Sequence, residues 1–119
     1  MTDRFEDHRG VIQDILSGPI DQVTEIFTKA GSVRGNHIHR QTVQWTYIAW
    51  GSLLVAWDDG SGAGPQQKQY GPGSLITEPA KVPHAWKALE DTLVLVFTRG
   101  PRSGEDYESD THRLERPIL

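Results

Sequence analysis

The feature that most constrains this chain is the way glycine and proline cut it into short apolar runs. Its 119 residues include 12 glycines and 7 prolines, which favour tight turns over long helices. Between the turns lie runs rich in β-branched and aromatic residues: residues 23–28, 44–50, 53–57, 75–77 and 93–98. Several short strands separated by turns predict an all-β sandwich or a small antiparallel β-barrel.

The residues between these runs predict how the strands are joined. The glycine–serine pair at 51–52 separates two runs and predicts a β-hairpin. The glycine-rich segment 58–65 predicts a flexible loop, and residues 70–73 predict a tight turn. No amphipathic helical pattern exceeds a turn or two, and residues 11–17 fit either a strand or a helical turn.

Length, cysteine content and charge bound the class of protein. The length fits one domain over residues 1–119. The absence of cysteine excludes disulfides and thiolate chemistry and, with an N-terminus that lacks an apolar run, predicts a cytoplasmic protein. No stretch reaches the roughly 18 apolar residues of a membrane span. The net charge of -4, with no cluster of basic residues, argues against nucleic acid as a partner.

His37 and His39 form the most informative pair of side chains. On a strand, residues two apart point to the same face, so both imidazoles would face the same space. Imidazole binds zinc, iron, copper and nickel, and manganese less strongly. Gln44 could add its amide oxygen, and an antiparallel barrel could return His84 to the same place. Spacing alone leaves a metal site and ordinary core or surface histidines both open.

The sequence around the histidine pair resembles the first motif of the cupin superfamily. That motif, G-x5-H-x-H-x4-E-x6-G, matches at four positions and has glutamine in the Glu position. The positions concerned are Gly31, His37, His39, Gln44 and Gly51. The resemblance implies an antiparallel barrel of the double-stranded β-helix, or jelly-roll, type over residues about 24–98.

A later segment resembles the second cupin motif, G-x5-P-x-G-x2-H-x3-N. It matches at Gly73, Pro79 and His84, and it departs at Lys81 and Ala88, where Gly and Asn are usual. Because lysine resists a positive φ, we expect the turn at position 81 to differ from the usual one. The polar C-terminal segment, residues 100–119, is expected to lie over the barrel or a partner subunit.

The resemblance implies that one divalent ion, Fe, Mn, Ni or Zn, is held by His37, His39, Gln44 and His84. An amide at position 44 leaves the full charge of the ion, which favours a small polar or anionic ligand. The implied function is a small-molecule enzyme that uses Lewis-acid or dioxygen chemistry, and small cupins often form homodimers. The residues expected around the pocket are Arg34, Asn36, Thr46, Ile48 and Trp86.

A narrower resemblance points to cupins that isomerise or epimerise nucleotide-linked keto sugars. It involves the segments DHRGV at 7–11, RGNHIH at 34–39 and GEDYESD at 104–110. In that family two histidines act as acid and base without metal, which implies those roles for His37 and His39 and a phosphate contact for Arg34. His84 favours the metal site, because those isomerases usually carry an aromatic residue there. A non-catalytic ligand-binding module is a third alternative.

Overall fold

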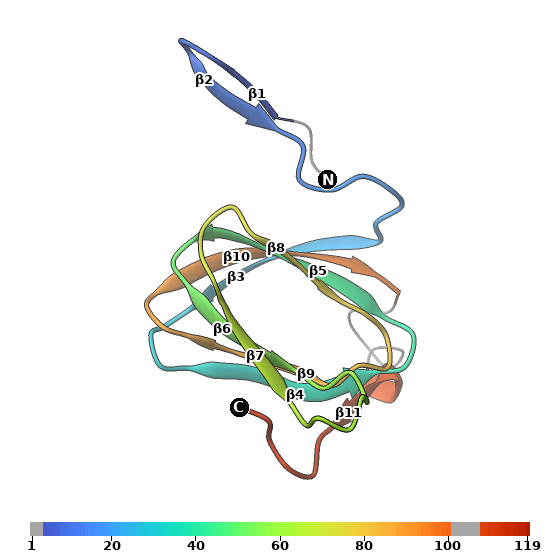
Figure 1. The fold of residues 1–119 in the computed structure, drawn as a ribbon. Helices are drawn as coiled ribbons and strands as arrows, with labels where there is room; N and C mark the ends of the chain where they lie inside the picture. The colour runs from blue at the N-terminus through green and yellow to red at the C-terminus, as the bar shows by residue number, and fades with distance from the viewer. Residues whose placement is uncertain (1–3, 101–107) are drawn as a thin grey trace.

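The computed structural model describes residues 4–100 and 108–119, and its regular structure is almost entirely β-strand (Figure 1). This confirms the predicted all-β class. No helix within these residues is long and apolar enough to span a membrane. The strands are β1 (Arg4–Asp7), β2 (Gly10–Gln13), β3 (Gln22–Thr28), β4 (Val33–His39), β5 (Val43–Trp50), β6 (Leu53–Trp57), β7 (Gln66–Tyr70), β8 (Leu75–Glu78), β9 (His84–Ala88), β10 (Thr92–Arg99) and β11 (Thr111–Arg113).

Two antiparallel sheets face each other and enclose the interior of the barrel in Figure 1. One sheet has the strand order β3-β10-β5-β8, and the other has the order β11-β4-β9-β6-β7. From β3 onward, consecutive strands lie in opposite sheets, except for the β6–β7 hairpin. Such repeated crossing between two sheets is the jelly-roll arrangement, which confirms the predicted barrel type.

The predicted hairpin at residues 51–52 is wrong. β5 pairs with β8 and β10, whereas β6 pairs with β7 and β9, so the chain crosses from one sheet to the other at this turn. Gly51 has a φ of 99° and packs against β10 so closely that a Cβ atom would collide with Thr92 and lie 2.6 Å from the carbonyl oxygen of Asp91. The glycine therefore makes a barrel corner, where backbones approach closely, and not a return turn.

The barrel interior is apolar at one end and polar at the other. Along β5, alternate side chains are buried, and they change from Ile48 through Thr46 to Gln44. The apolar end is the hydrophobic core, which is formed by Ile48, Leu53, Val55, Ile76, Trp86, Ala88, Val94 and Val96. The period-two burial expected of strands thus positions a polar interior site beside the core.

The first two strands form a hairpin outside the barrel. β1 pairs only with β2 among the described strands, and Figure 1 shows the hairpin projecting from the barrel on the connecting segment 14–21. Its apolar side chains are exposed, including 57% of Phe5 and 68% of Ile12.

In the turn before β9, lysine stands where the second cupin motif usually has glycine. Lys81 has a φ of 68°, so it adopts the left-handed conformation that lysine was expected to resist. Its backbone N–H donates a hydrogen bond of 2.6 Å to the carbonyl oxygen of His39, which ties the turn to the end of β4. The surrounding structure therefore holds a non-glycine residue in the left-handed region at a cost in free energy.

We expect Lys81→Gly to increase the free energy of unfolding by about 0.5–1 kcal/mol, because relief of the left-handed strain exceeds the added entropy of glycine in the unfolded chain. Urea denaturation monitored by circular dichroism measures this change. Lys81→Ala, which keeps a Cβ atom, is the matched control and should bring no such gain. Equal effects of the two substitutions would contradict the explanation.

Candidate functional site

A β-bulge in β4 directs into the same cavity two side chains that a regular strand would place on opposite faces. The β4–β9 register shifts between Gly35 and His37, where Gly35 and Asn36 have φ values of 94° and 57°. The extra residue lets Arg34 and His37 both line the cavity, although they would face opposite sides of a regular strand. A Cβ atom at Gly35 would lie 2.9 Å from the carbonyl oxygen of His84, so this close approach requires glycine.

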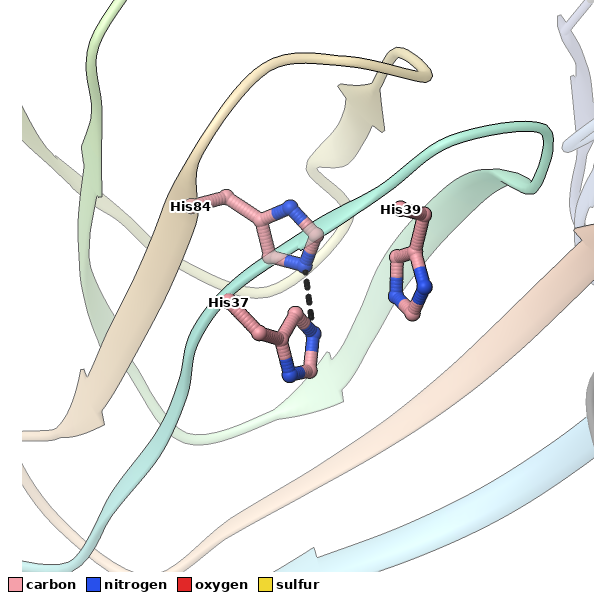
Figure 2. A group of neighbouring side chains, drawn as sticks. All are labelled: His37, His39 and His84. Atoms are coloured by element: carbon pink, nitrogen blue, oxygen red, sulfur yellow. Dashed lines mark hydrogen bonds between the residues drawn. The ribbon is translucent and has the colours of Figure 1, made fainter. Parts of the chain in front are cut away.

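Three histidines meet at the polar end of the barrel, as Figure 2 shows. His37 and His39 come from β4, and His84 begins β9 opposite His37. One potential ligand nitrogen from each imidazole lies within 4.8 Å of the other two, and the Nε2 atoms of His37 and His84 are 3.0 Å apart. His39 and His84 are buried, and His37 is half-buried. The structure thus brings together the three histidines that the two motifs single out.

The C-terminal segment orients His39 from behind. The Nδ1 atom of His39 lies 3.2 Å from the hydroxyl oxygen of Thr111 and 3.7 Å from Oδ2 of Asp110. Nδ1 is directed at these groups, and Nε2 is on the opposite edge of the ring. Hydrogen-bonding groups behind an imidazole fix its tautomer and orientation, and this arrangement supports both metal ligands and catalytic bases.

Asp110 also ties the end of β4 to the start of β5. Its carboxylate accepts backbone hydrogen bonds of 2.6 Å from Gln41 and 3.1 Å from Thr42. Burial by itself raises the pKa of the Asp110 carboxyl, but hydrogen bonds from Thr42 and Gln41 and the attraction of His39 together hold this pKa below its usual value. Asp110 is therefore a carboxylate at neutral pH, placed next to the histidine cluster.

Glu78, which sequence reasoning did not single out, faces the cluster from the opposite sheet. Its side chain is 4% exposed, and its Oε2 atom lies 3.1 Å from Nε2 of His84. The hydroxyl of Thr46 donates a hydrogen bond to the other carboxylate oxygen. In the β5–β8 register, Glu78 lies directly opposite Gln44. A strand of period two that includes Ile76 would have placed Glu78 on the same inward face.

Two cavities adjoin the cluster, and both are lined by Glu78 and His84. The first, of about 410 Å³, is polar in its lining, and the second, of about 360 Å³, is bounded largely by apolar side chains such as Val55 and Trp57. Two exposed residues that line the polar cavity, Glu108 and Arg113, were also not expected from the sequence. The predicted site residues that line the polar cavity are Arg34, His37, Gln44, Thr46, His84 and Trp86.

Two of the predicted pocket residues lie elsewhere. Ile48 is fully buried in the hydrophobic core. Asn36 anchors the C-terminus: its Oδ1 atom accepts hydrogen bonds from the backbone N–H groups of Ile118, at 2.8 Å, and Leu119, at 3.2 Å. Neither residue lines the two cavities next to the cluster.

The side chains at this site fit a divalent transition-metal ion. Two ligands about 2.1 Å from one ion lie about 3.0 Å apart at a right angle and about 3.4 Å apart in a tetrahedron. The Nε2 atoms of His37 and His84 already have this separation, and His39 completes a set of nitrogens within 4.8 Å. Three imidazoles, of which His37 and His84 line the polar cavity while His39 is buried and lines neither cavity, are a donor set that zinc, iron, nickel and manganese accept.

The fold and the histidine-lined interior define a small jelly-roll protein, and the family follows from the sequence. The family profile described as Cupin matches residues 20–106, which is more than half of the chain. The chain therefore belongs to the cupin family. A search of curated protein sequences finds no match.

Several solved structures share the fold. QdtA, a sugar 3,4-ketoisomerase from Thermoanaerobacterium thermosaccharolyticum in complex with TDP, has a TM-score of 0.78 and 16% identity over 96% of this chain and 85% of its own. The dTDP-4-dehydrorhamnose 3,5-epimerase from Sulfolobus tokodaii has a TM-score of 0.71 and 19% identity over 91% and 70%. The capsular polysaccharide assembling protein CapF from Staphylococcus aureus has a TM-score of 0.71 and 17% identity over 98% and 33%, so this chain spans about a third of CapF. At these identities the likeness concerns the fold.

Asp110→Asn should lower stability in a pH-dependent way. The pKa of Asp110 is lower in the folded protein than in the unfolded chain, where it is about 3.9, so the ionised carboxylate stabilises the fold at pH values above the unfolded pKa. This stability is lost as the pH falls through the folded pKa. In EDTA at pH 7 we expect a loss of about 1–3 kcal/mol, because hydrogen bonds to a charged acceptor are weakened. Thermal unfolding of both proteins from pH 7 to pH 2.5 measures the difference, which should shrink below about pH 4. A difference that stays the same at every pH would contradict this role, and Asp14→Asn, at an exposed carboxyl group, is the matched control.

Proposed function

We propose that this protein is a metal-binding cupin in which His37, His39 and His84 hold one divalent ion, Fe, Mn, Ni or Zn. The observation that carries the proposal is the buried cluster itself, with one nitrogen from each imidazole within 4.8 Å of the others. When bound, such an ion supplies Lewis acidity or a centre for dioxygen chemistry. Gln44 lines the same cavity and offers its amide oxygen as a weak further ligand.

The remaining side chains of the cavity favour a small, polar or anionic molecule. Arg34 and Arg113 line the polar cavity and provide positive charge for an anionic group. The Arg34 guanidinium also donates hydrogen bonds to the Thr28 hydroxyl and the Phe27 carbonyl oxygen. Trp86, which is 6% exposed, forms an apolar wall between the cavity and the core. Asp110 and Thr111 keep His39 oriented toward the interior. These contacts support binding of a small anion beside the cluster.

A nucleotide-linked sugar is the second candidate ligand, with isomerisation or epimerisation as the reaction. Similar solved structures include a sugar 3,4-ketoisomerase in complex with TDP and a dTDP-4-dehydrorhamnose 3,5-epimerase. In this chain, His39 lies beside the Asp110 carboxylate, and this arrangement suits a general base. The His37 ring lies 4.5 Å from the His39 ring, centroid to centroid, and would be the acid. A non-catalytic binding module would use the same pocket, because a set of ligands does not define a reaction.

We expect untagged protein to contain about one equivalent of metal per chain by elemental analysis, because three neutral imidazoles converge on one point. His84→Ala should lose this metal, and His8→Ala, which removes an exposed histidine, is the matched control. Absence of metal after purification and after reloading with iron, manganese, nickel and zinc would contradict the proposal. Thermal protection of that metal-free protein by dTDP-sugars would then favour the metal-free isomerase, and protection without turnover would favour a binding module.

We further propose that the protein is a homodimer in which the β1–β2 hairpin packs against a second copy. An isolated two-stranded hairpin is marginally stable in water, and this one exposes Phe5 and Ile12. β3 is an edge strand that exposes Val23 and Phe27, so it provides a second unpaired apolar surface.

Ile12→Asp should shift the protein from dimer to monomer, because it places a charge in the apolar contact. Sedimentation velocity at several protein concentrations measures the change. Leu89→Asp, at an exposed apolar residue of the barrel, is the control and should leave the dimer intact. A wild-type protein that sediments as a monomer at every concentration would contradict the proposal.

A further inference from the structure

Glu78 lies where a negatively charged metal ligand would complete the histidine cluster. We propose that the Glu78 carboxylate is a direct ligand of the divalent ion and takes over the charge-neutralising role of the motif glutamate that position 44 lacks. This inference rests on the metal-binding function proposed above. It concerns an unspecified position of the second motif, between Gly73 and Pro79, on the strand that pairs with the strand of Gln44.

The distances around His84 support a shared cation. Its Nε2 atom lies 3.0 Å from Nε2 of His37 and 3.1 Å from Oε2 of Glu78. A neutral imidazole offers at Nε2 either one hydrogen or one lone pair, so it cannot make two full hydrogen bonds there. Adjacent ligands of one small ion lie about 3.0–3.4 Å apart, which matches both separations. One ion can therefore bind all three groups at once, which a single hydrogen or lone pair at Nε2 of His84 cannot do.

The strand register explains how position 78 can substitute for position 44. Gln44 on β5 and Glu78 on β8 are directly opposite and both buried. Directly opposite residues have Cβ atoms about 4.5–5.5 Å apart, so a carboxylate on either strand reaches much of the same volume. Gln44 and three neutral imidazoles leave a divalent ion with its whole charge inside the barrel, which is costly. Glu78 offsets one unit of that charge.

The surroundings of Glu78 prepare it for this role. Thr46, the inward residue after Gln44 on β5, donates a hydrogen bond to Oε1, while Oε2 remains directed at His84. Such a contact behind a ligand fixes its orientation. Because both cavities are lined by Glu78 and His84, the carboxylate borders open space on two sides instead of being sealed in the core. That space can admit a substrate next to the ion.

The test measures metal binding and not turnover. Titration of the metal-free full chain with Zn²⁺ by calorimetry, and with Co²⁺ by visible absorption, compares wild type with Glu78→Gln. We expect Glu78→Gln to weaken affinity by about 10- to 100-fold and to change the Co²⁺ spectrum, since one oxygen ligand is lost. Glu25→Gln makes the same chemical change at an exposed residue of β3 and should match wild type. The double variant Gln44→Glu/Glu78→Gln should regain most of the lost affinity, because it returns a carboxylate on the opposite strand.

The outcomes separate this inference from the proposed function. Wild-type affinity and an unchanged Co²⁺ spectrum in folded Glu78→Gln would overturn the ligand role of Glu78 while leaving the three-histidine site intact. No metal binding by wild type would overturn both. Loss of affinity without rescue in the double variant would also overturn the inference, because Glu78 would then act through folding. Circular dichroism and thermal unfolding of each metal-free variant establish that the proteins compared are folded.

Discussion

The antiparallel pairing of β4 with β9 is the interaction on which the rest of the site depends. It brings His37 beside His84, which is 47 positions later in the chain, and a slip of one residue would turn these side chains out of the barrel. The bulge within this pairing places Asn36 in the left-handed region, with a φ of 57°. Hydrogen bonds from Ile118 and Leu119 to the Asn36 side chain hold the bulge. The last residues of the chain thus stabilise the geometry of its first cupin motif.

The residues that stabilise the fold and the residues of the candidate site lie on different parts of the same strands. Each of the two central strands of the β3-β10-β5-β8 sheet buries alternate residues, and toward one end Ile48 and Val94 supply hydrophobic stabilisation. At the other end the buried residues are Gln44 and Thr98, which supply none. Burial of polar groups costs free energy unless partners are present, so the polar end depends on the apolar end for its stability. A strained or costly polar interior of this kind is typical of a functional site.

The sequence was sufficient for the barrel and the three histidines, because strand periodicity and motif spacing are local signals. It was insufficient wherever the outcome depended on distant packing. A glycine-containing turn at Gly51 does not reveal whether the chain folds back or crosses to the opposite sheet, and here Thr92 of β10 decides it. Glu78 lies just beyond the predicted run 75–77 and before a proline, so the sequence did not single it out, although β8 extends to include it. Asp110 belongs to the polar C-terminal segment, whose composition gave no sign that this side chain is buried against the β4–β5 turn; residues 101–107 of the segment lie outside the described structure. Lys81 adopts a conformation that its residue type disfavours, because the end of β4 holds its N–H.

Charge balance connects the two functions considered for this site. Asp110 lies behind His39, and Glu78 lies beside His84, so the imidazole cluster is flanked by carboxyl groups on two sides. Two carboxylates and three neutral imidazoles match the charge of one divalent ion. Both functions would use the same arrangement, because a carboxylate beside an imidazole can orient it as a metal ligand and can equally orient it for proton transfer.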